Sequence, residues 1–127
     1  MTMELSRLVL LAMLLLLVAA CAARAASTSG PSATAAPRID AAEARALLER
    51  GGVLVDVRSA AEFRMGHIDG AINLPVGRVR RAIDTLPGDG PIVVYCLSGH
   101  RSARAARELA EAGRAEVYDL GSLSNWD

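Results

Sequence analysis

The segment IVVYCLSGHRSARAARELAEA, residues 92–112, decides the fold of this chain. Its first four residues, 92–95, form a continuous apolar run, which is typical of a β-strand covered on both faces in a parallel sheet. Residues 102–112 follow a helical period and place an apolar stripe on one face, formed by Ala103, Ala106, Leu109 and Ala110. A buried strand that leads directly into a helix is the repeating unit of parallel α/β domains.

The same alternation continues on both sides of this segment. Further strands are predicted at residues 53–57, 71–74 and 116–120, and further helices at residues 40–50, 59–64 and 78–86. Asp40 is expected to cap the first of these helices, with Glu43 as its capping-box partner. Together the elements predict an α/β domain with a parallel sheet and right-handed crossovers.

The composition excludes several classes of function. The chain has 127 residues and a formal net charge of zero, and all 14 of its basic residues are arginines. This balance excludes a general nucleic-acid binder, which carries a strong basic excess. Two cysteines, Cys21 and Cys96, exclude a disulfide framework and a cysteine-built zinc site. Because His67 and His100 are the only histidines, we expect neither a metal nor another cofactor.

The N-terminal residues follow the layout of a bacterial export signal. Arg7 precedes the apolar run at residues 8–20, which is shorter than the roughly 20 residues that span a membrane comfortably. The last residues of the run, Val18-Ala19-Ala20, lead into Cys21, and this pattern resembles the lipobox of bacterial lipoproteins. The resemblance implies a signal peptide over residues 1–21 and lipidation of Cys21.

A lipidated Cys21 would place the protein in the bacterial cell envelope, exported and facing the periplasm, with the lipid as its only membrane contact. The alternatives are ordinary cleavage near residues 23–25, which gives a soluble periplasmic protein, and a short uncleaved anchor. Residues 22–37 are rich in Ala, Ser, Thr and Pro and are predicted to be a disordered linker. One folded domain is then expected over residues 38–127.

The chemistry is expected in the loop between the strand at 92–95 and the helix at 102–112. Cys96 begins this loop, and Gly99 permits a tight turn whose N–H groups converge on the positive end of the following helix. Arg101 adds a full positive charge. Such a setting lowers the pKa of a thiol, so Cys96 is the candidate nucleophile. The alternative is an inert, buried cysteine at the end of a strand.

Three motifs stand out within the predicted domain. They are LVDVR at residues 54–58 with Glu62-Phe63 after it, GHIDGAINLP at 66–75, and CLSGHRS at 96–102. Together, and in this order, they resemble the motifs of rhodanese-type sulfurtransferases. The resemblance implies a small rhodanese-like α/β domain with a parallel five-stranded sheet.

The resemblance also implies covalent catalysis by Cys96 in two displacements. The thiolate would take sulfane sulfur from a small anionic donor such as thiosulfate. The resulting persulfide would pass it to a thiol acceptor, a small molecule or a protein, or to cyanide in an assay. His100 either helps to hold the donor or points into solvent. The substrate-binding residues are expected to be Leu97, Ser98, Gly99, His100, Arg101 and Ser102.

Two other functions remain open from the residues. A phosphatase or arsenate-reductase-like enzyme also cradles an oxyanion over a cysteine, but tyrosine-phosphatase-type loops resemble Cys-x5-Arg. Cys96 and Arg101 enclose only four residues, which favours sulfur transfer. A noncatalytic rhodanese-like binding module is the second alternative, although such modules commonly lack the cysteine. Asp56, Arg58 and His67 are interpreted as structural residues.

Overall fold

The computed structural model describes residues 35–127. The predicted signal peptide at 1–21, the predicted lipidation site Cys21 and most of the predicted linker at 22–37 lie outside the described residues. In the described part, no helix is long and apolar enough to cross a membrane.

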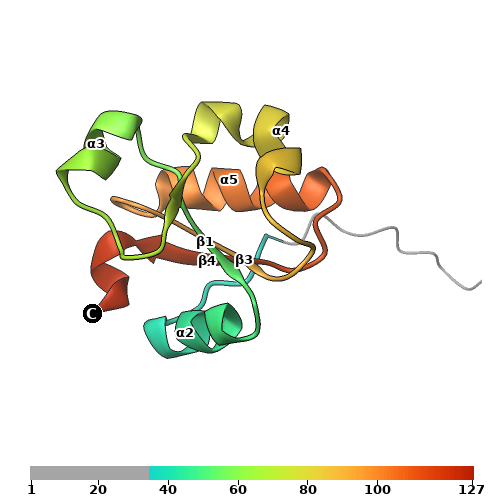
Figure 1. Ribbon diagram of the computed structural model, residues 1–127, viewed down its shortest axis with the longest axis horizontal. Helices are drawn as coiled ribbons and strands as arrows, with labels where there is room; N and C mark the ends of the chain where they lie inside the picture. Colours follow the sequence, from blue (N-terminus) through green and yellow to red (C-terminus); the bar gives the residue numbers. More distant parts are fainter. Residues whose placement is uncertain (1–34) are drawn as a thin grey trace, which may run out of the picture. The chain divides into compact units, whose positions relative to one another are not determined.

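The sheet of the described domain consists of four parallel strands in the spatial order β2–β1–β3–β4 (Figure 1). Their bounds are β1 (Val53–Asp56), β2 (Ile72–Asn73), β3 (Ile92–Cys96) and β4 (Val117–Ser122). Strand β3 lies inside the sheet and all of its residues are buried, as its continuous apolar run predicts. Because the strands are parallel, their carboxyl ends meet at one edge, where the chain leaves β3 for the cysteine loop.

Helices cover both faces of this sheet. One face carries α2, and the opposite face carries α3, α4 and α5 (Figure 1). Their bounds are α2 (Ala41–Glu49), α3 (Ala60–Met65), α4 (Val79–Ala82) and α5 (His100–Glu111). The predicted capping box of α2 is confirmed, because Glu43 N donates to Asp40 Oδ1 at 2.9 Å and Asp40 N donates to Glu43 Oε2 at 3.0 Å.

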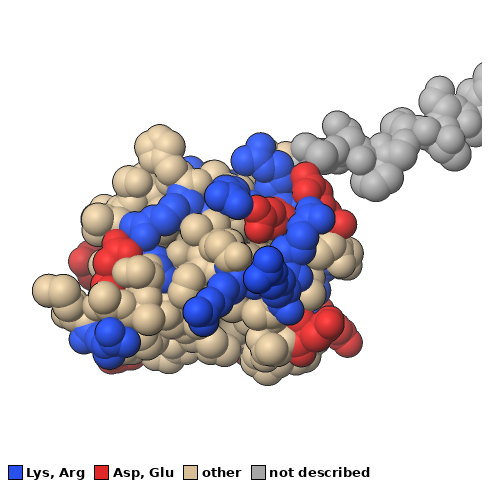
Figure 2. Space-filling model, turned by 90° about the horizontal axis from the view of Figure 1, so that it is seen from above, with Lys and Arg blue, Asp and Glu red and all other residues tan. Residues whose placement is uncertain are grey.

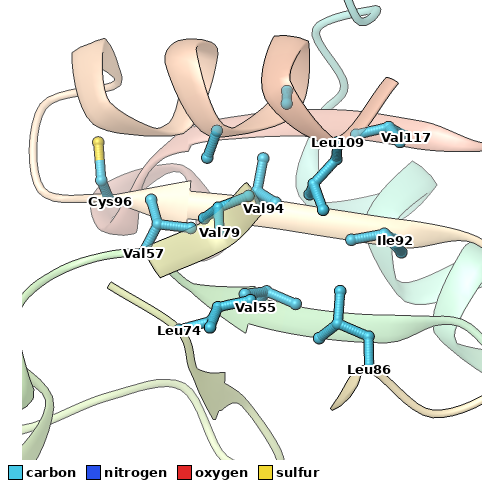
Figure 3. Close-up of a cluster of buried hydrophobic side chains, with 12 residues drawn as sticks. Val55, Val57, Leu74, Val79, Leu86, Ile92, Val94, Cys96, Leu109 and Val117 are labelled. Atoms are coloured by element: carbon cyan, nitrogen blue, oxygen red, sulfur yellow. The ribbon is translucent and has the colours of Figure 1, made fainter. Parts of the chain in front are cut away.

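Strand β3 contributes to two hydrophobic cores, because successive strand residues point to opposite faces of a sheet. Val93 and Tyr95 belong to the core that includes Ala44 of α2. Val94 and Cys96 belong to the core that includes Leu109 of α5 (Figure 3). The sheet is therefore buried on both faces, which explains why the central strand β3 is an uninterrupted apolar run.

Helix α5 begins at His100, two residues earlier than predicted, because Gly99 occupies the N-cap position in a left-handed conformation. Its buried residues are Ser102, Ala105, Ala106 and Leu109. The prediction that Ala103 and Ala110 face the core is wrong, since both are exposed. Alanine is small enough for either face of a helix, so an alanine-rich pattern does not define which face is buried.

The helix predicted at residues 78–86 is only partly α-helical. Helix α4 covers four residues, and short 3-10 helices flank it on both sides, η1 (Val76–Arg78) and η2 (Ile83–Thr85). Arginine side chains gather over α4 and α5 on this face (Figure 2). Two of them form exposed ion pairs, Arg80 with Glu111 and Arg104 with Glu108. Such exposed pairs contribute little to stability, so we interpret this face as a solvated surface.

The expectation of a five-stranded sheet is wrong for the described residues. Beside β4 the chain forms only a single parallel bridge, between Arg38 and Asp119. Ile39 N donates to Asp119 O, and Asp119 N donates to Pro37 O, both at 3.0 Å. Pro37 has no N–H to extend the ladder, and Asp40 already caps α2. The extended segment is therefore too short to become a strand.

Candidate active site

Cys96 is the last residue of β3, and its side chain is fully buried. Its sulfur points from the end of the strand towards the first turn of α5 (Figure 3). Gly99 N donates a hydrogen bond to Cys96 Sγ at 2.9 Å, and the thiol donates to Ser102 Oγ at 3.6 Å. The loop thus curls around the sulfur and directs hydrogen-bonding groups at it.

Contacts with β4 hold this loop in shape. Ser102 Oγ lies 3.1 Å from Gly99 O and 3.4 Å from Gly121 O, so its hydroxyl can donate to either carbonyl. The hydroxyl of Ser122 donates to Leu97 O at 2.7 Å. The cysteine loop is therefore fixed between α5 and the neighbouring strand, and its N–H groups are preorganised.

Burial by itself raises the pKa of the Cys96 thiol, but the hydrogen bonds of the loop outweigh this effect. The groups that oppose it are the backbone N–H and hydroxyl of Ser102 and the backbone N–H groups of Gly99 and Ser98. Because these groups stabilise the thiolate, the pKa of Cys96 lies below its ordinary value. The nucleophilic form is therefore present at a lower pH than in a free cysteine.

We expect Ser102→Ala to raise the pKa of Cys96. The Ser102 hydroxyl, which accepts from the neutral thiol, can rotate to donate to the thiolate, and the variant removes it while the backbone donors stay in place. The midpoint of Cys96 alkylation by iodoacetamide, followed against pH, should move to higher pH. Thr85→Ala removes a hydroxyl in η2 and should leave the profile unchanged. An unaltered midpoint in Ser102→Ala would mean that the backbone donors alone set the pKa.

We expect Gly99→Ala to disturb both the backbone and the cysteine loop. Gly99 has a φ of +94°, and a Cβ there would stand 3.2 Å from Arg38 Nη1. Gly113 is the matched control, because its φ is +101° and the space around it is open. Both alanine variants should lose roughly 1–2 kcal/mol of unfolding free energy to backbone strain. Only Gly99→Ala should also slow Cys96 alkylation, because alanine keeps the N–H but strains the turn that directs it at Sγ. Equal rates in the two variants would mean that the loop keeps its geometry without glycine at this position.

The outer positions of the loop are open to solvent. Leu97 is 56% exposed, and Ser98 and His100 are also exposed. Ser98 Oγ and His100 Nδ1 form a hydrogen bond of 3.2 Å across the turn. Among the described residues, no group of three or more His, Cys, Asp or Glu side chains could hold a metal ion.

Arg101 forms a two-pronged ion pair with Glu62 of α3. Its Nη1 and Nη2 donate to Oε2 and Oε1 of Glu62, each at 2.8 Å. These hydrogen bonds, followed by those from Ser59, hold the pKa of Glu62 well below its usual range. The capping box of α3 identifies Glu62 from the sequence, since Ser59 N donates to it. Nothing local predicts that its second partner lies 39 positions further along the chain.

The family model for the rhodanese-like domain matches residues 40–127 of this chain. The chain belongs to the rhodanese-like domain family. The match covers β3, the cysteine loop and α5.

Relatives and solved structures agree with this assignment. The thiosulfate sulfurtransferase GlpE of Pseudomonas savastanoi pv. phaseolicola is 38% identical over 90 residues, which are 70% of this chain and 85% of GlpE. The YqhL protein of Bacillus subtilis is 38% identical over 78 residues, 61% of this chain and 62% of YqhL. The human single-domain sulfurtransferase TSTD1 is similar in structure, with a TM-score of 0.62 and 29% identity over 72% of this chain and 95% of that one.

This rhodanese-like domain contains a buried ion pair at the end of β1, the strand that pairs with β3. Asp56 is fully buried at the end of β1, and Arg58 is almost fully buried. Arg58 Nε donates to both Asp56 carboxylate oxygens at 3.0 Å, and its Nη2 donates to Asp56 Oδ2 at 2.6 Å. Arg58 Nη2 also donates to Gly66 O at 2.7 Å. The structural role predicted for Asp56 and Arg58 is confirmed.

The same rhodanese-like domain anchors its GHIDGA motif against β3 and α3. Tyr95 OH accepts a hydrogen bond from Ile68 N at 3.2 Å, and burial raises the pKa of Tyr95 to about 12. The His67 ring stacks on Phe63 with 3.6 Å between ring centroids, and its Nδ1 lies 2.9 Å from Phe63 O. These contacts agree with the interpretation of His67 as a structural residue.

Proposed function

We propose that this chain is a sulfurtransferase that moves sulfane sulfur from a small anionic donor, such as thiosulfate, through a Cys96 persulfide to a thiol acceptor. The observation that carries the proposal is the buried Cys96 Sγ with the Gly99 N–H directed at it from 2.9 Å. The 38% sequence identity to GlpE, a thiosulfate sulfurtransferase, supports the reaction class at the level of the family.

The first displacement loads the enzyme. The Cys96 thiolate attacks the outer sulfur of thiosulfate, a new S–S bond forms, the S–S bond of the donor breaks, and sulfite leaves with the electron pair. The N–H groups of the loop and the positive end of α5 attract the anionic donor. Arg101 contributes further positive charge, which its ion pair with Glu62 partly neutralises.

The second displacement unloads it. An acceptor thiolate, or cyanide, attacks the outer sulfur of the Cys96 persulfide, and the Cys96 thiolate leaves with the electron pair. The donors that lower the pKa of Cys96, among them the N–H groups of Gly99 and Ser98, also stabilise this leaving thiolate. The Cys96 thiolate is the nucleophile in the first step and the leaving group in the second, so the same donors assist both steps.

The length of the loop favours sulfur over phosphate chemistry. Four residues separate Cys96 from Arg101, and the Arg101 guanidinium is already held by both oxygens of Glu62. A phosphoryl group would need a wider ring of N–H donors and a free guanidinium fork. A single sulfur atom on Cys96 needs only the donors that already surround Sγ.

The test is the intact mass of the purified full chain before and after thiosulfate, and again after cyanide. We expect a gain of one sulfur atom that Cys96→Ser abolishes and that cyanide removes as thiocyanate. No adduct on a Cys96 shown to be free and reduced would overturn the proposal for thiosulfate and favour a noncatalytic rhodanese-like module.

We also propose that the protein is exported and held in the bacterial cell envelope by a lipid on Cys21. The support is the position of Cys21 directly after the apolar run at residues 8–20. The full chain, expressed in a bacterium, should fractionate with membranes, and Cys21→Ser should release it into the soluble fraction. An identical distribution of the two proteins would contradict lipidation.

A further inference from the structure

An open hollow of about 690 Å³ lies beside the cysteine loop. Leu97, which directly follows the nucleophile, forms part of its wall, and Ser122 ties this wall to β4 through the hydrogen bond to Leu97 O. His67 of the GHIDGA motif and Trp126 contribute other parts of the lining. The hollow is thus lined by Leu97 of the cysteine loop and by Ser122, which holds that loop, and it opens next to the site of sulfur loading.

The charged side chains that line this hollow are carboxylates. They are Asp69 and Asp127, whereas no arginine of residues 35–127 lines it. Within residues 35–127, Asp69 forms no ion pair and is exposed. The Nδ1 atom of the His67 imidazole is hydrogen-bonded to the carbonyl oxygen of Phe63. Arg45 packs its guanidinium 4.5 Å from the centre of the Trp126 ring and donates to Trp126 O, outside the hollow.

The cysteine loop presents positive partial charges, in contrast to the carboxylates of the hollow. Its N–H groups converge on Cys96 Sγ, and α5 directs its positive end there. An anionic donor is therefore drawn to the loop, while the hollow beside it disfavours anions and favours cations. Two reactants that meet at one sulfur would approach it through surfaces of different charge.

We propose that the hollow is the acceptor site and that its acceptor is a small aminothiol, whose ammonium group lies near Asp69. This inference rests on the proposed sulfur transfer through Cys96. The exposed Leu97 side chain offers apolar contact for the carbon chain of such a thiol, and Asp69 is the specificity-determining residue. The thiol gives its proton to solvent, its thiolate bonds to the outer persulfide sulfur, and the Cys96 thiolate leaves as that bond breaks.

The experiment measures single-turnover discharge of the persulfide. The full chain is loaded with thiosulfate, freed of excess donor, and mixed with cysteamine, 2-mercaptoethanol or 3-mercaptopropionate at equal thiolate concentrations. Each rate is expressed relative to that of the same thiol with a small organic disulfide in solution, because a thiolate of lower pKa is a weaker nucleophile. On this scale cysteamine should react fastest and 3-mercaptopropionate slowest. Asp69→Asn should reduce the ratio of these two rates by about threefold, as expected for one exposed charge. Asp84→Asn, the same exchange at an exposed residue of η2, should leave the ratio unchanged.

The outcomes separate this inference from the proposed function. A chain that gains no sulfur from thiosulfate overturns both. A chain that loads normally but discharges to the three thiols at equal relative rates, or keeps its full preference in Asp69→Asn, overturns the acceptor site alone. A preference that Asp69→Asn reduces and that disappears at high salt supports it, because salt screens exposed charges.

Discussion

Replacing Cys96 by serine is expected to lower the rate of sulfur transfer from thiosulfate to cyanide by at least about 1000-fold. A serine hydroxyl cannot form the S–S bond that carries the transferred sulfur, and no other cysteine lies in the described part of the chain. The fold should survive, because Gly99 N and Ser102 Oγ remain available to the new hydroxyl. Initial rates of thiocyanate formation measure the first effect, and thermal unfolding measures the second.

The chain contains its own control for this exchange. Cys21→Ser makes the same chemical change at the only other cysteine, outside the predicted domain, and should leave the rate unaltered. Substantial activity in Cys96→Ser would contradict the persulfide mechanism. Loss of activity in Cys21→Ser would show that the N-terminal segment takes part in catalysis.

Replacing Asp56 by alanine is expected to lower the free energy of unfolding by about 3–5 kcal/mol, because it leaves the Arg58 guanidinium buried without its carboxylate. The native pair is almost entirely removed from solvent, with side-chain exposures of 0% for Asp56 and 6% for Arg58. Three hydrogen bonds from the guanidinium to the carboxylate are lost together. Urea unfolding followed by circular dichroism gives the change directly.

An exposed ion pair provides the matched comparison. Glu111→Ala also removes a carboxylate from an arginine, but the Arg80–Glu111 pair lies in solvent, with exposures of 63% and 43%. Its loss should cost less than about 1 kcal/mol. Equal destabilisation in the two variants would mean that burial of Asp56 and Arg58 does not set the energy of their interaction.

The loss of Asp56 should also disturb the segments next to the cysteine loop. Asp56 pairs in register with Tyr95, the residue before Cys96, and Arg58 reaches the carbonyl of Gly66 in the GHIDGA motif. The buried pair thus connects β1 with the segment that carries His67. Asp56→Ala therefore tests the scaffold of the site, because it leaves Cys96 and the other residues of the cysteine loop unsubstituted.

The cysteine loop was predictable from the sequence because all of its parts are local. The apolar run of β3, the turn at Gly99 and the start of α5 follow one another within a few residues, and each has a strong signal of its own. The capping boxes of α2 and α3 are local in the same way, since donor and acceptor lie three positions apart.

Other features could not be predicted because they join segments that are distant in sequence. Glu62 and Arg101 lie 39 positions apart, and Ile68 and Tyr95 lie 27 positions apart. These pairs meet only after the parallel pairing of β1 with β3 brings their elements to one edge of the sheet. The buried face of α5 was predicted incorrectly at Ala103 and Ala110 because alanine tolerates either environment.

The sequence by itself determined the α/β alternation, the position of Cys96 between a buried strand and a helix, and the turn at Gly99 that directs N–H groups at its sulfur. These follow from hydrophobic periodicity, turn chemistry and helix capping, which act over a few bonds. Only the tertiary structure decided that Arg101 is held by Glu62, that the edge beside β4 carries one bridge in place of a fifth strand, and that a carboxylate-lined hollow adjoins the loop. Those features depend on which segments the sheet brings together, and packing between distant segments leaves no local signal.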